Sequence, residues 1–281
     1  MSKITKAIIP VAGWGTRRLP ITKIIEKCML PIGNRPIVDY IVEDCVRGGI
    51  TDIYFVISRG STQIKDYYSR NRKLEEYLVA NGKEDKLELT IPPTNVNFHY
   101  SYQDLGAGEK YGTAVPIAIV LEEIGTDEPV VVVMGDDFIY RPDGGSETAD
   151  LIAKYQPGEA VMLGVPIDKD DERKFGFLEL DGDKLVRIAE AITVDKAPSN
   201  LINVSRYVMP PKLLAEVQKF VDVESIDDPE YYITTVPFDN FIKNGGVVRV
   251  VSAKGEYLDG GSLEGWLHAN EVIGQSLLKS T

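Results

Sequence analysis

Cysteine and histidine are scarce in this sequence. Its 281 residues include two cysteines, Cys28 and Cys45, and two histidines, His99 and His268. Two cysteines supply neither a disulfide framework nor a set of zinc ligands, and two histidines do not supply a histidine-based metal site. A reduced, cytoplasmic compartment is the expected location.

Positive charge and long apolar runs are also lacking. Lysine and arginine total 31 against 43 aspartates and glutamates, which gives a formal net charge of −12. An acidic chain is not expected to bind nucleic acid or an anionic membrane through a general basic surface. No apolar run reaches the roughly 18 residues of a transmembrane helix, and the apolar stretch near Met1 is too short for a signal-peptide core. We therefore expect neither a nucleic-acid nor a membrane partner.

The segments that are present alternate between strand-like and helix-like patterns. Predicted strands are Lys6–Val11, Asp52–Ser58, Asn97–Tyr102, Pro129–Met134, Ala160–Pro166, Phe175–Leu180, Leu201–Val208 and Val247–Val251, with a hairpin turn at Gly182-Asp183. Predicted helices are Pro36–Arg47, Gln63–Leu78, Thr113–Ile124, Pro210–Phe220, Thr235–Lys243 and Leu263–Leu278. The order predicts an α/β fold with a Rossmann-like, mostly parallel mixed sheet flanked by helices and an added α+β portion. Because no repeat or linker divides the chain, residues 1–281 are expected to form a single domain, with the added portion after about residue 140.

The loop after the first predicted strand combines glycine with positive charge. Gly13 and Gly15 follow the strand directly, and glycine lets backbone N–H groups approach a phosphate chain closely. The cations of this loop are Arg17, Arg18, Lys23 and Lys27. In a chain of net charge −12 this concentration predicts a local anion site at the carboxyl edge of the sheet.

Two common nucleotide-binding motifs do not fit this loop. A dinucleotide fingerprint needs a third glycine where Arg18 stands, which opposes an NAD-linked oxidoreductase, and the Gly-Lys-Ser/Thr of a Walker loop is absent. A surface loop with merely solvated cations is the remaining alternative. The coincidence of glycines, cations and a preceding strand favours a phosphate site.

At this point the residues resemble a known family. Gly13-Trp-Gly-Thr-Arg17, Leu19-Pro20, Lys27 and Met29-Leu30-Pro31 are similar to the signature of sugar-1-phosphate nucleotidylyltransferases. Further similar segments are Gly48-Gly49-Ile50-Thr51, Gly112-Thr113-Ala114, Gly135-Asp136-Asp137, Phe175-Gly176, Ala197-Pro198-Ser199-Asn200, Arg206-Tyr207 and Leu258-Asp259-Gly260-Gly261. The resemblance runs over nearly the whole chain, and within the family it is strongest to the enzymes that use UTP and glucose 1-phosphate.

The resemblance implies an in-line transfer in which the sugar phosphate attacks the α-phosphorus of a nucleoside triphosphate and pyrophosphate leaves. It assigns catalytic roles to Arg17, which would hold the triphosphate, and to Lys27, which would contact the α-phosphate or the attacking phosphate. It pairs Asp136 and Asp259 around Mg²⁺, which prefers one or two carboxylates with phosphate oxygens and water. The implied nucleotide-binding residues are Ala12, Gly13, Gly15, Thr16, Gln103 and Gly112.

The sugar side carries the largest departure from the family pattern. Gly176, Glu190 and Asn200 are the implied sugar-binding residues, within a sugar-binding and C-terminal part over residues 141–281 that follows a nucleotide-binding part over residues 1–140. The family usually has a lysine after Glu190, where this chain has Ala191. Lys174 and Lys196 are candidates to replace that cation.

The expected activity is therefore transfer of a uridylyl group from UTP to glucose 1-phosphate. Thymidylyl or cytidylyl transfer to a related sugar 1-phosphate is the alternative within the family. The missing lysine also leaves open a non-catalytic paralogue that binds sugar nucleotides. The family resemblance further implies a homo-oligomer, either a dimer or a tetramer.

Overall fold

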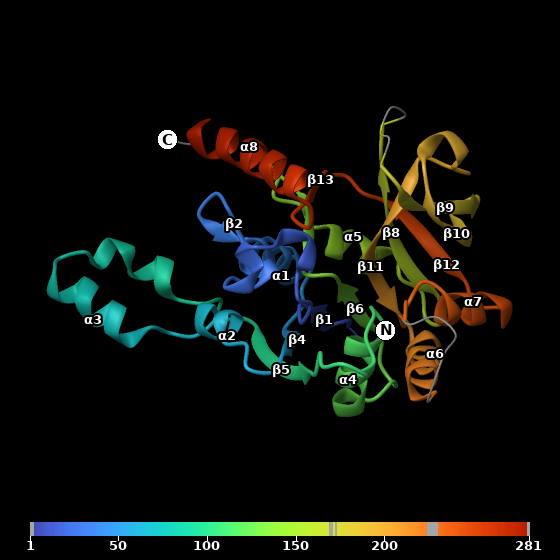
Figure 1. Ribbon diagram of the computed structural model, residues 1–281, viewed down its shortest axis with the longest axis horizontal. Coiled ribbons are helices and arrows are strands. Elements are labelled where there is room, and N and C mark those ends of the chain that lie inside the picture. Colours follow the sequence, from blue (N-terminus) through green and yellow to red (C-terminus); the bar gives the residue numbers. More distant parts are fainter. Residues whose placement is uncertain (1–2, 169–170, 172, 224–229, 280–281) are drawn as a thin grey trace.

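A computed structural model describes residues 3–168, 171, 173–223 and 230–279. Within these ranges a nine-stranded sheet crosses the molecule in the order β5-β4-β1-β6-β11-β8-β12-β10-β9, with helices on both faces (Figure 1). The strands are β1 (Lys6–Pro10), β4 (Asp52–Ser58), β5 (Asn97–Gln103), β6 (Val130–Val133), β8 (Ala160–Pro166), β9 (Phe175–Asp181), β10 (Lys184–Ile192), β11 (Leu201–Met209) and β12 (Val248–Ser252).

The sheet is mixed but mostly parallel, as predicted. Strands β5, β4, β1 and β6 run parallel to one another, and β8 runs parallel to β12. Strand β11 is antiparallel to both β6 and β8, and β10 is antiparallel to both β12 and β9. In the described part of the chain, β11 and β10 thus run against the direction of the other strands. The predicted turn at Gly182-Asp183 is confirmed, because Asp181 pairs with Lys184 across it.

A hydrophobic core lies on each face of the sheet. Helices α1 (Ile37–Arg47) and α5 (Glu147–Lys154) contribute to one core, and α4 (Val115–Ile124), α6 (Pro211–Asp222) and α7 (Val236–Lys243) contribute to the other. The four valines of β6 are buried, and they alternate, with Val131 and Val133 in the first core and Val130 and Val132 in the second. A continuous β-branched run is therefore explained by burial on both faces. Helix α5 was not among the predicted elements.

The predicted single helix over Gln63–Leu78 is wrong. The structure has two helices, α2 (Gln63–Tyr67) and α3 (Arg72–Ala80), in an arm that extends away from the sheet (Figure 1). Between them Tyr68 is buried against the ring of Phe55, and the Asn71 side chain accepts a hydrogen bond from the Leu74 N–H at 3.1 Å. An asparagine N-cap starts a new helix and so favours the break.

Two short strand pairs lie outside the nine-stranded sheet, and the second of them joins distant segments of the chain. Strand β2 (Pro31–Ile32) pairs with β3 (Arg35–Pro36), and β7 (Asp137–Tyr140) pairs with β13 (Glu256–Asp259). The last helix, α8 (Leu263–Lys279), lies beside β2 and β13. None of the helices in the described ranges has the length and apolar character needed to cross a membrane.

Candidate active site

The basic loop after β1 is tightly folded rather than extended. It contains three short 3₁₀ turns, η1 (Thr16–Arg18), η2 (Ile21–Lys23) and η3 (Lys27–Met29). Gly15 has φ +61°, and a Cβ there would lie 3.0 Å from Thr22 Cγ2 and 3.1 Å from Lys27 Cβ. The Thr22 hydroxyl also donates to the Gly15 carbonyl at 2.9 Å. Glycine at this position therefore lets the loop fold back on itself and brings Lys27 next to the end of β1.

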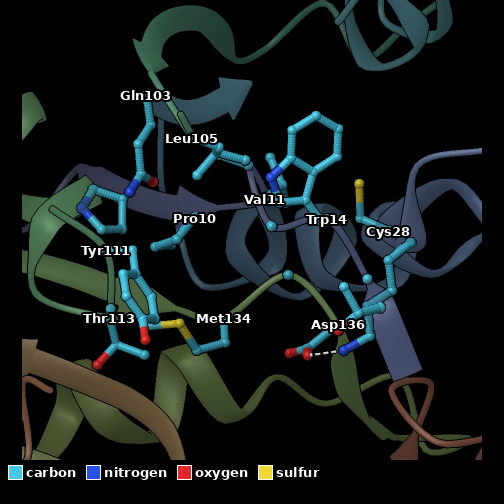
Figure 2. Close-up of a pocket in the computed structure, with 18 of the residues that line it drawn as sticks. Pro10, Val11, Trp14, Cys28, Gln103, Leu105, Tyr111, Thr113, Met134 and Asp136 are labelled. Carbon is cyan, nitrogen blue, oxygen red and sulfur yellow. Dashed lines mark hydrogen bonds and ion pairs between the residues drawn. The ribbon is translucent and has the colours of Figure 1, made fainter. Parts of the chain in front are cut away.

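A cavity of about 570 Å³ opens where β1, β5 and β6 end. It is lined by all six predicted nucleotide-binding residues, Ala12, Gly13, Gly15, Thr16, Gln103 and Gly112, together with Arg17, Lys27 and Asp136. In Figure 2 Gln103 lies on one side of this cavity, and Asp136 lies on the other, at the end of the dashed line. The structure thus brings together residues that the sequence places in four separate segments.

Gln103 is the last residue of β5 and is 6% exposed. Its side chain points into the cavity toward Pro10 and Tyr111 (Figure 2). An amide both donates and accepts hydrogen bonds, and one at this depth can read the edge of a pyrimidine base. Gln103 is therefore not a solvated residue of an exposed loop.

Gly112 has a packing role as well as a place in the cavity wall. Its φ is +119°, and a Cβ would lie 2.5 Å from the backbone nitrogen of Tyr231. The Tyr231 N–H donates to the Tyr111 carbonyl at 2.9 Å, so the residue 230–233 segment is held against this loop. That segment also places Tyr232 in the cavity wall.

The two predicted metal ligands lie close together because β7 pairs with β13. Asp259 stands opposite Asp137 in this pairing, and the Gly260 N–H donates to the Asp136 carbonyl at 3.1 Å. The Asp259 carboxylate accepts hydrogen bonds of 2.6 Å from the Gly261 N–H and from the Ser262 hydroxyl. Its two oxygens are therefore held in a fixed orientation.

Lys27 completes this group. Its ammonium donates to Asp136 Oδ2 at 2.5 Å, and a Cβ on Gly261 would lie 2.9 Å from both Lys27 Nζ and Asp259 Oδ1. A larger residue at Gly261 would push these groups apart. The lysine supplies positive charge between carboxylates that repel each other.

A third carboxylate, Asp137, lies behind this pair. Withdrawal from water, followed by the charges of Asp136 and Asp259, raises its pKa well above the ordinary value, while the Arg206 guanidinium lowers it. The Tyr257 hydroxyl donates to Asp137 Oδ2 at 3.1 Å. Arg206 is itself 1% exposed and donates to Asp44 Oδ2 at 2.5 Å. One buried cation therefore acts on both Asp44 and Asp137.

The described residues contain no cluster of three or more histidines, cysteines or acids arranged as a metal site. Two carboxylates beside a loop rich in cations nevertheless suit Mg²⁺, whose remaining ligands are commonly phosphate oxygens and water. Asp136 and Asp259 therefore fit the expected ion, with the nucleotide supplying ligands that the protein lacks.

The predicted sugar-binding residues lie outside the cavity, on the β9–β10 hairpin and at the start of β11. A Cβ on Gly176 would lie 2.8 Å from Glu190 Oε2, so the two residues are in contact across the hairpin. Asn200 precedes β11, where its carbonyl accepts a hydrogen bond from the Ile167 N–H at 3.0 Å. Ala191 has φ +55° at an irregularity of β10.

Two residues that orient the carboxylates were missed from the sequence. Ser262 donates to Asp259 and Tyr257 donates to Asp137, and their position beside Leu258-Asp259-Gly260-Gly261 was the available signal. Trp266 on α8 was also unassigned. Its indole N–H donates to the Pro31 carbonyl at 2.9 Å, and the Arg18 guanidinium lies 5.0 Å from its ring centroid. It holds α8 against the basic loop.

The chain is similar in sequence to known proteins. The chain is 33% identical over 228 residues to a UTP–glucose-1-phosphate uridylyltransferase 2 of Streptococcus pyogenes serotype M3, covering 78% of this chain and 75% of that protein. It is 28% identical over 288 residues to a UTP–glucose-1-phosphate uridylyltransferase of Pseudomonas aeruginosa, covering 99% of this chain and 98% of that one.

The fold is similar to that of solved structures. A UTP-bound UGPase from Acinetobacter baumannii superposes with a TM-score of 0.83 at 25% identity, covering 97% of this chain and 94% of that one. A UDP-glucose pyrophosphorylase complexed with UDP-glucose gives a TM-score of 0.77 at 25% identity, covering 97% and 99%. The sequence profile of the nucleotidyl transferase family matches residues 6–276, and the chain belongs to that family.

Proposed function

We propose that this protein transfers a uridylyl group from UTP to glucose 1-phosphate, giving UDP-glucose and pyrophosphate. One observation carries the proposal: a single cavity has a buried amide, Gln103, on one side and the charged group of Arg17, Lys27 and Asp136 on the other. A pyrimidine nucleotide has the matching polarity, with a base that hydrogen-bonds at one end and phosphates at the other. The similarity to uridylyltransferases supports the choice of UTP and glucose 1-phosphate.

In this proposal the base lies against Gln103. Its amide donates to one uracil carbonyl or accepts from the N3–H, and the backbone at Ala12, Gly13 and Gly112 lines the same wall. A volume of about 570 Å³ lies within the range of small-molecule sites. Gly15 and Thr16 would then border the phosphates, where the loop turns.

Arg17 and Lys27 neutralise the phosphates. Arg17 is exposed and makes no hydrogen bond or ion pair with any described residue, so its fork is free to bind the β- and γ-phosphates. Lys27 would move its hydrogen bonds from Asp136 to the α-phosphate. An oxygen of the sugar phosphate attacks the α-phosphorus in line, the bond from that phosphorus to the bridging oxygen breaks, and pyrophosphate leaves with the electron pair.

We propose Mg²⁺ as the cofactor, held by Asp136 and Asp259. When bound, the ion would neutralise charge on the phosphates and align them. The chain's own contribution is to fix the two carboxylates, through the β7–β13 pairing and the hydrogen bonds from Gly261 and Ser262.

The sugar is assigned to the second part of the chain. Glu190 would accept hydrogen bonds from sugar hydroxyls, Gly176 leaves room for the ring against the backbone, and Asn200 would contact a further hydroxyl. Residues 1–140 then form the nucleotide-binding part and residues 141–281 the sugar-binding and C-terminal part of a single domain.

We further propose a cytoplasmic homo-oligomer, either a dimer or a tetramer. Leu263 and Leu267 on α8 are more than half exposed, which leaves apolar surface for a second copy, and both cysteines are buried thiols. Light scattering over a range of protein concentrations measures the assembly. A mass of one chain at every concentration would contradict it.

Pyrophosphate release tests the activity. Purified protein with Mg²⁺ and glucose 1-phosphate is supplied in turn with UTP, dTTP, CTP, ATP and GTP. Release with UTP well above the other nucleotides is expected. Release with dTTP or CTP instead would replace the uridylyl assignment by thymidylyl or cytidylyl transfer. UDP-glucose binding without release from any triphosphate and sugar phosphate would favour a non-catalytic protein.

A further inference from the structure

Positive charge on the sugar side of the carboxylates would favour binding of the second substrate in the proposed reaction. A sugar 1-phosphate is a dianion, and the group it must approach contains Asp136, Asp137 and Asp259. Arg17 and Lys27 lie on the nucleotide side, in the basic loop. A further cation on the sugar side would attract this dianion and offset the repulsion by the carboxylates.

Ala191 does not supply that cation. In the β9–β10 pairing Ala189 stands opposite Phe177 and Ile192 opposite Phe175, so Glu190 and Ala191 together oppose the single residue Gly176. This is a β-bulge, and its second residue has φ +55°. The bulge puts a methyl group where the family pattern has a lysine.

Arg173 lies at the same end of this hairpin. It precedes Phe175 by two residues, and Phe175 pairs with Ile192, which directly follows Ala191. The guanidinium lies 5.0 Å from the centroid of the Phe175 ring. Stacking on an aromatic face restricts a long side chain that would otherwise sample many rotamers.

Asp171 fixes the Arg173 guanidinium further. Arg173 Nε donates to Asp171 Oδ1 at 3.0 Å, and Nη2 donates to Oδ2 at 2.6 Å. The Arg173 backbone N–H also donates to Asp171 Oδ1, at 2.9 Å. None of the hydrogen bonds seen in the described residues uses Arg173 Nη1, so one arm of the fork is available to a ligand.

The charges of β13 act on the Arg173 guanidinium. Phe175, beneath Arg173, packs against the same core as Tyr257, and Tyr257 shares a face of β13 with Asp259 two residues later. The hydrogen bonds to Asp171 raise the pKa of Arg173 most, and the charges of Tyr257 and Asp259 raise it further. Arg173 therefore lies within electrostatic reach of a predicted metal ligand.

We propose that Arg173 binds the phosphate of the sugar 1-phosphate, in place of the lysine that Ala191 has replaced, and that Asp171 positions it. This assignment rests on the proposed function and names the phosphate-binding group of the second substrate. Lys174 and Lys196, the two candidates from the sequence, are exposed like Arg173, but unlike Arg173 they form no ion pair within the described residues. Nothing there holds either ammonium toward Asp259.

Arg173→Ala tests the assignment, with Lys174→Ala as its matched control. The control removes a neighbouring exposed cation and changes the net charge equally. Arg173→Ala should raise the KM for glucose 1-phosphate by about 10- to 100-fold, while the KM for UTP stays within about twofold. Lys174→Ala should leave both values near those of the unmodified chain. Equal KM values for the two variants would overturn the proposal.

A double variant tests whether a cation at position 173 and a cation at position 191 would bind the same phosphate. Adding Ala191→Lys to Arg173→Ala should recover most of the lost affinity, whereas Ala191→Lys alone should change the KM by less than about threefold. A large gain from Ala191→Lys in the unmodified chain would mean that the phosphate position is empty of positive charge, and would overturn the assignment.

Direct binding separates this inference from the proposed activity. Calorimetric titration with glucose 1-phosphate, in the presence of Mg²⁺ and a non-hydrolysable UTP analogue, needs no turnover. If the unmodified chain releases no pyrophosphate, the proposed function fails, but weaker binding by Arg173→Ala than by Lys174→Ala still supports a phosphate contact. Equal binding by both variants overturns it in either case.

Discussion

The Lys27 ammonium donates a hydrogen bond of 2.5 Å to Asp136 Oδ2, and so joins a predicted catalytic residue to a predicted metal ligand. The Lys27 side chain is 13% exposed and that of Asp136 is 37% exposed, so the pair lies at the wall of the cavity rather than in bulk water. Before substrate arrives, the lysine lowers the mutual repulsion of the carboxylates. In the proposed complex with substrates and metal, this hydrogen bond must break. Lys27 would then contact a phosphate and Asp136 would bind the metal ion.

Lys27→Met should therefore separate metal binding from turnover. Removing the ammonium leaves Asp136 free, so the protein without nucleotide should bind Mn²⁺, a probe for Mg²⁺, more tightly than the unmodified chain. Turnover should fall by at least about 100-fold, because the variant lacks a cation for the phosphates. Electron paramagnetic resonance titration measures free Mn²⁺, and pyrophosphate release measures turnover. Unchanged Mn²⁺ affinity would show that Lys27 and the metal do not compete for Asp136.

Asp136→Asn and Asp259→Asn should each abolish metal-supported activity. An amide keeps the shape of the side chain but loses the charge that binds Mg²⁺. Asp181→Asn is the control, since Asp181 is an exposed aspartate at the end of β9. Pyrophosphate release is measured over a range of Mg²⁺ concentrations. If either variant releases pyrophosphate at the same Mg²⁺ concentrations as the control, the substituted residue is excluded as a ligand.

The sequence predicts some of these features better than others. Local patterns are sufficient for the glycine loop, for the buried valines of β6 and for the position of Asp136 after them, because each depends on neighbouring residues. The approach of Asp259 to Asp136 depends on β7 pairing with β13, and a four-residue strand such as Asp137–Tyr140 gives little pattern of its own. Asn71 breaks a helix that periodicity alone would continue. The role proposed for Arg173 depends on the bulge at Ala191, which the sequence does not reveal.

Arg17→Ala should lower turnover by at least about 100-fold with little change in melting temperature. The side chain is exposed and has no partner within the described residues, so its loss removes no folded-state contact. Lys23→Ala is the control, because Lys23 belongs to the same loop but does not line the cavity. Steady-state kinetics and thermal unfolding are measured for both variants. Near-normal turnover in Arg17→Ala would remove it from the catalytic role.

Ser262→Ala should weaken the metal site through Asp259. The Ser262 hydroxyl donates to Asp259 Oδ2 at 2.6 Å and accepts from the Gly265 N–H at 3.1 Å, so it both orients the carboxylate and caps α8. Loss of the cap should cost about 1 kcal/mol of unfolding free energy. Loss of the orienting bond should raise the Mg²⁺ requirement by about tenfold or more.

Ser146→Ala is the matched control for that variant. Ser146 caps α5 by accepting from the Ala149 N–H at 3.0 Å, and its hydroxyl donates to the Asp44 carbonyl rather than to Asp136 or Asp259. Both variants should lose stability in a denaturant titration, but Ser146→Ala should keep the normal Mg²⁺ requirement. An equal rise in the Mg²⁺ requirement of both variants would mean that Ser262 acts through stability alone.

Gln103→Ala should reduce discrimination between nucleotide bases more than it reduces stability. The buried amide faces the cavity, and a truncated side chain leaves the base edge without its protein partner. We expect kcat/KM for UTP to fall by about 10- to 100-fold and the preference for UTP over CTP to shrink by a similar factor, because CTP never gained the full contact. Ser101→Ala, on the same strand but outside the cavity, should leave both values unchanged. A uniform loss for UTP and CTP alike would mean that Gln103 shapes the cavity without reading the base.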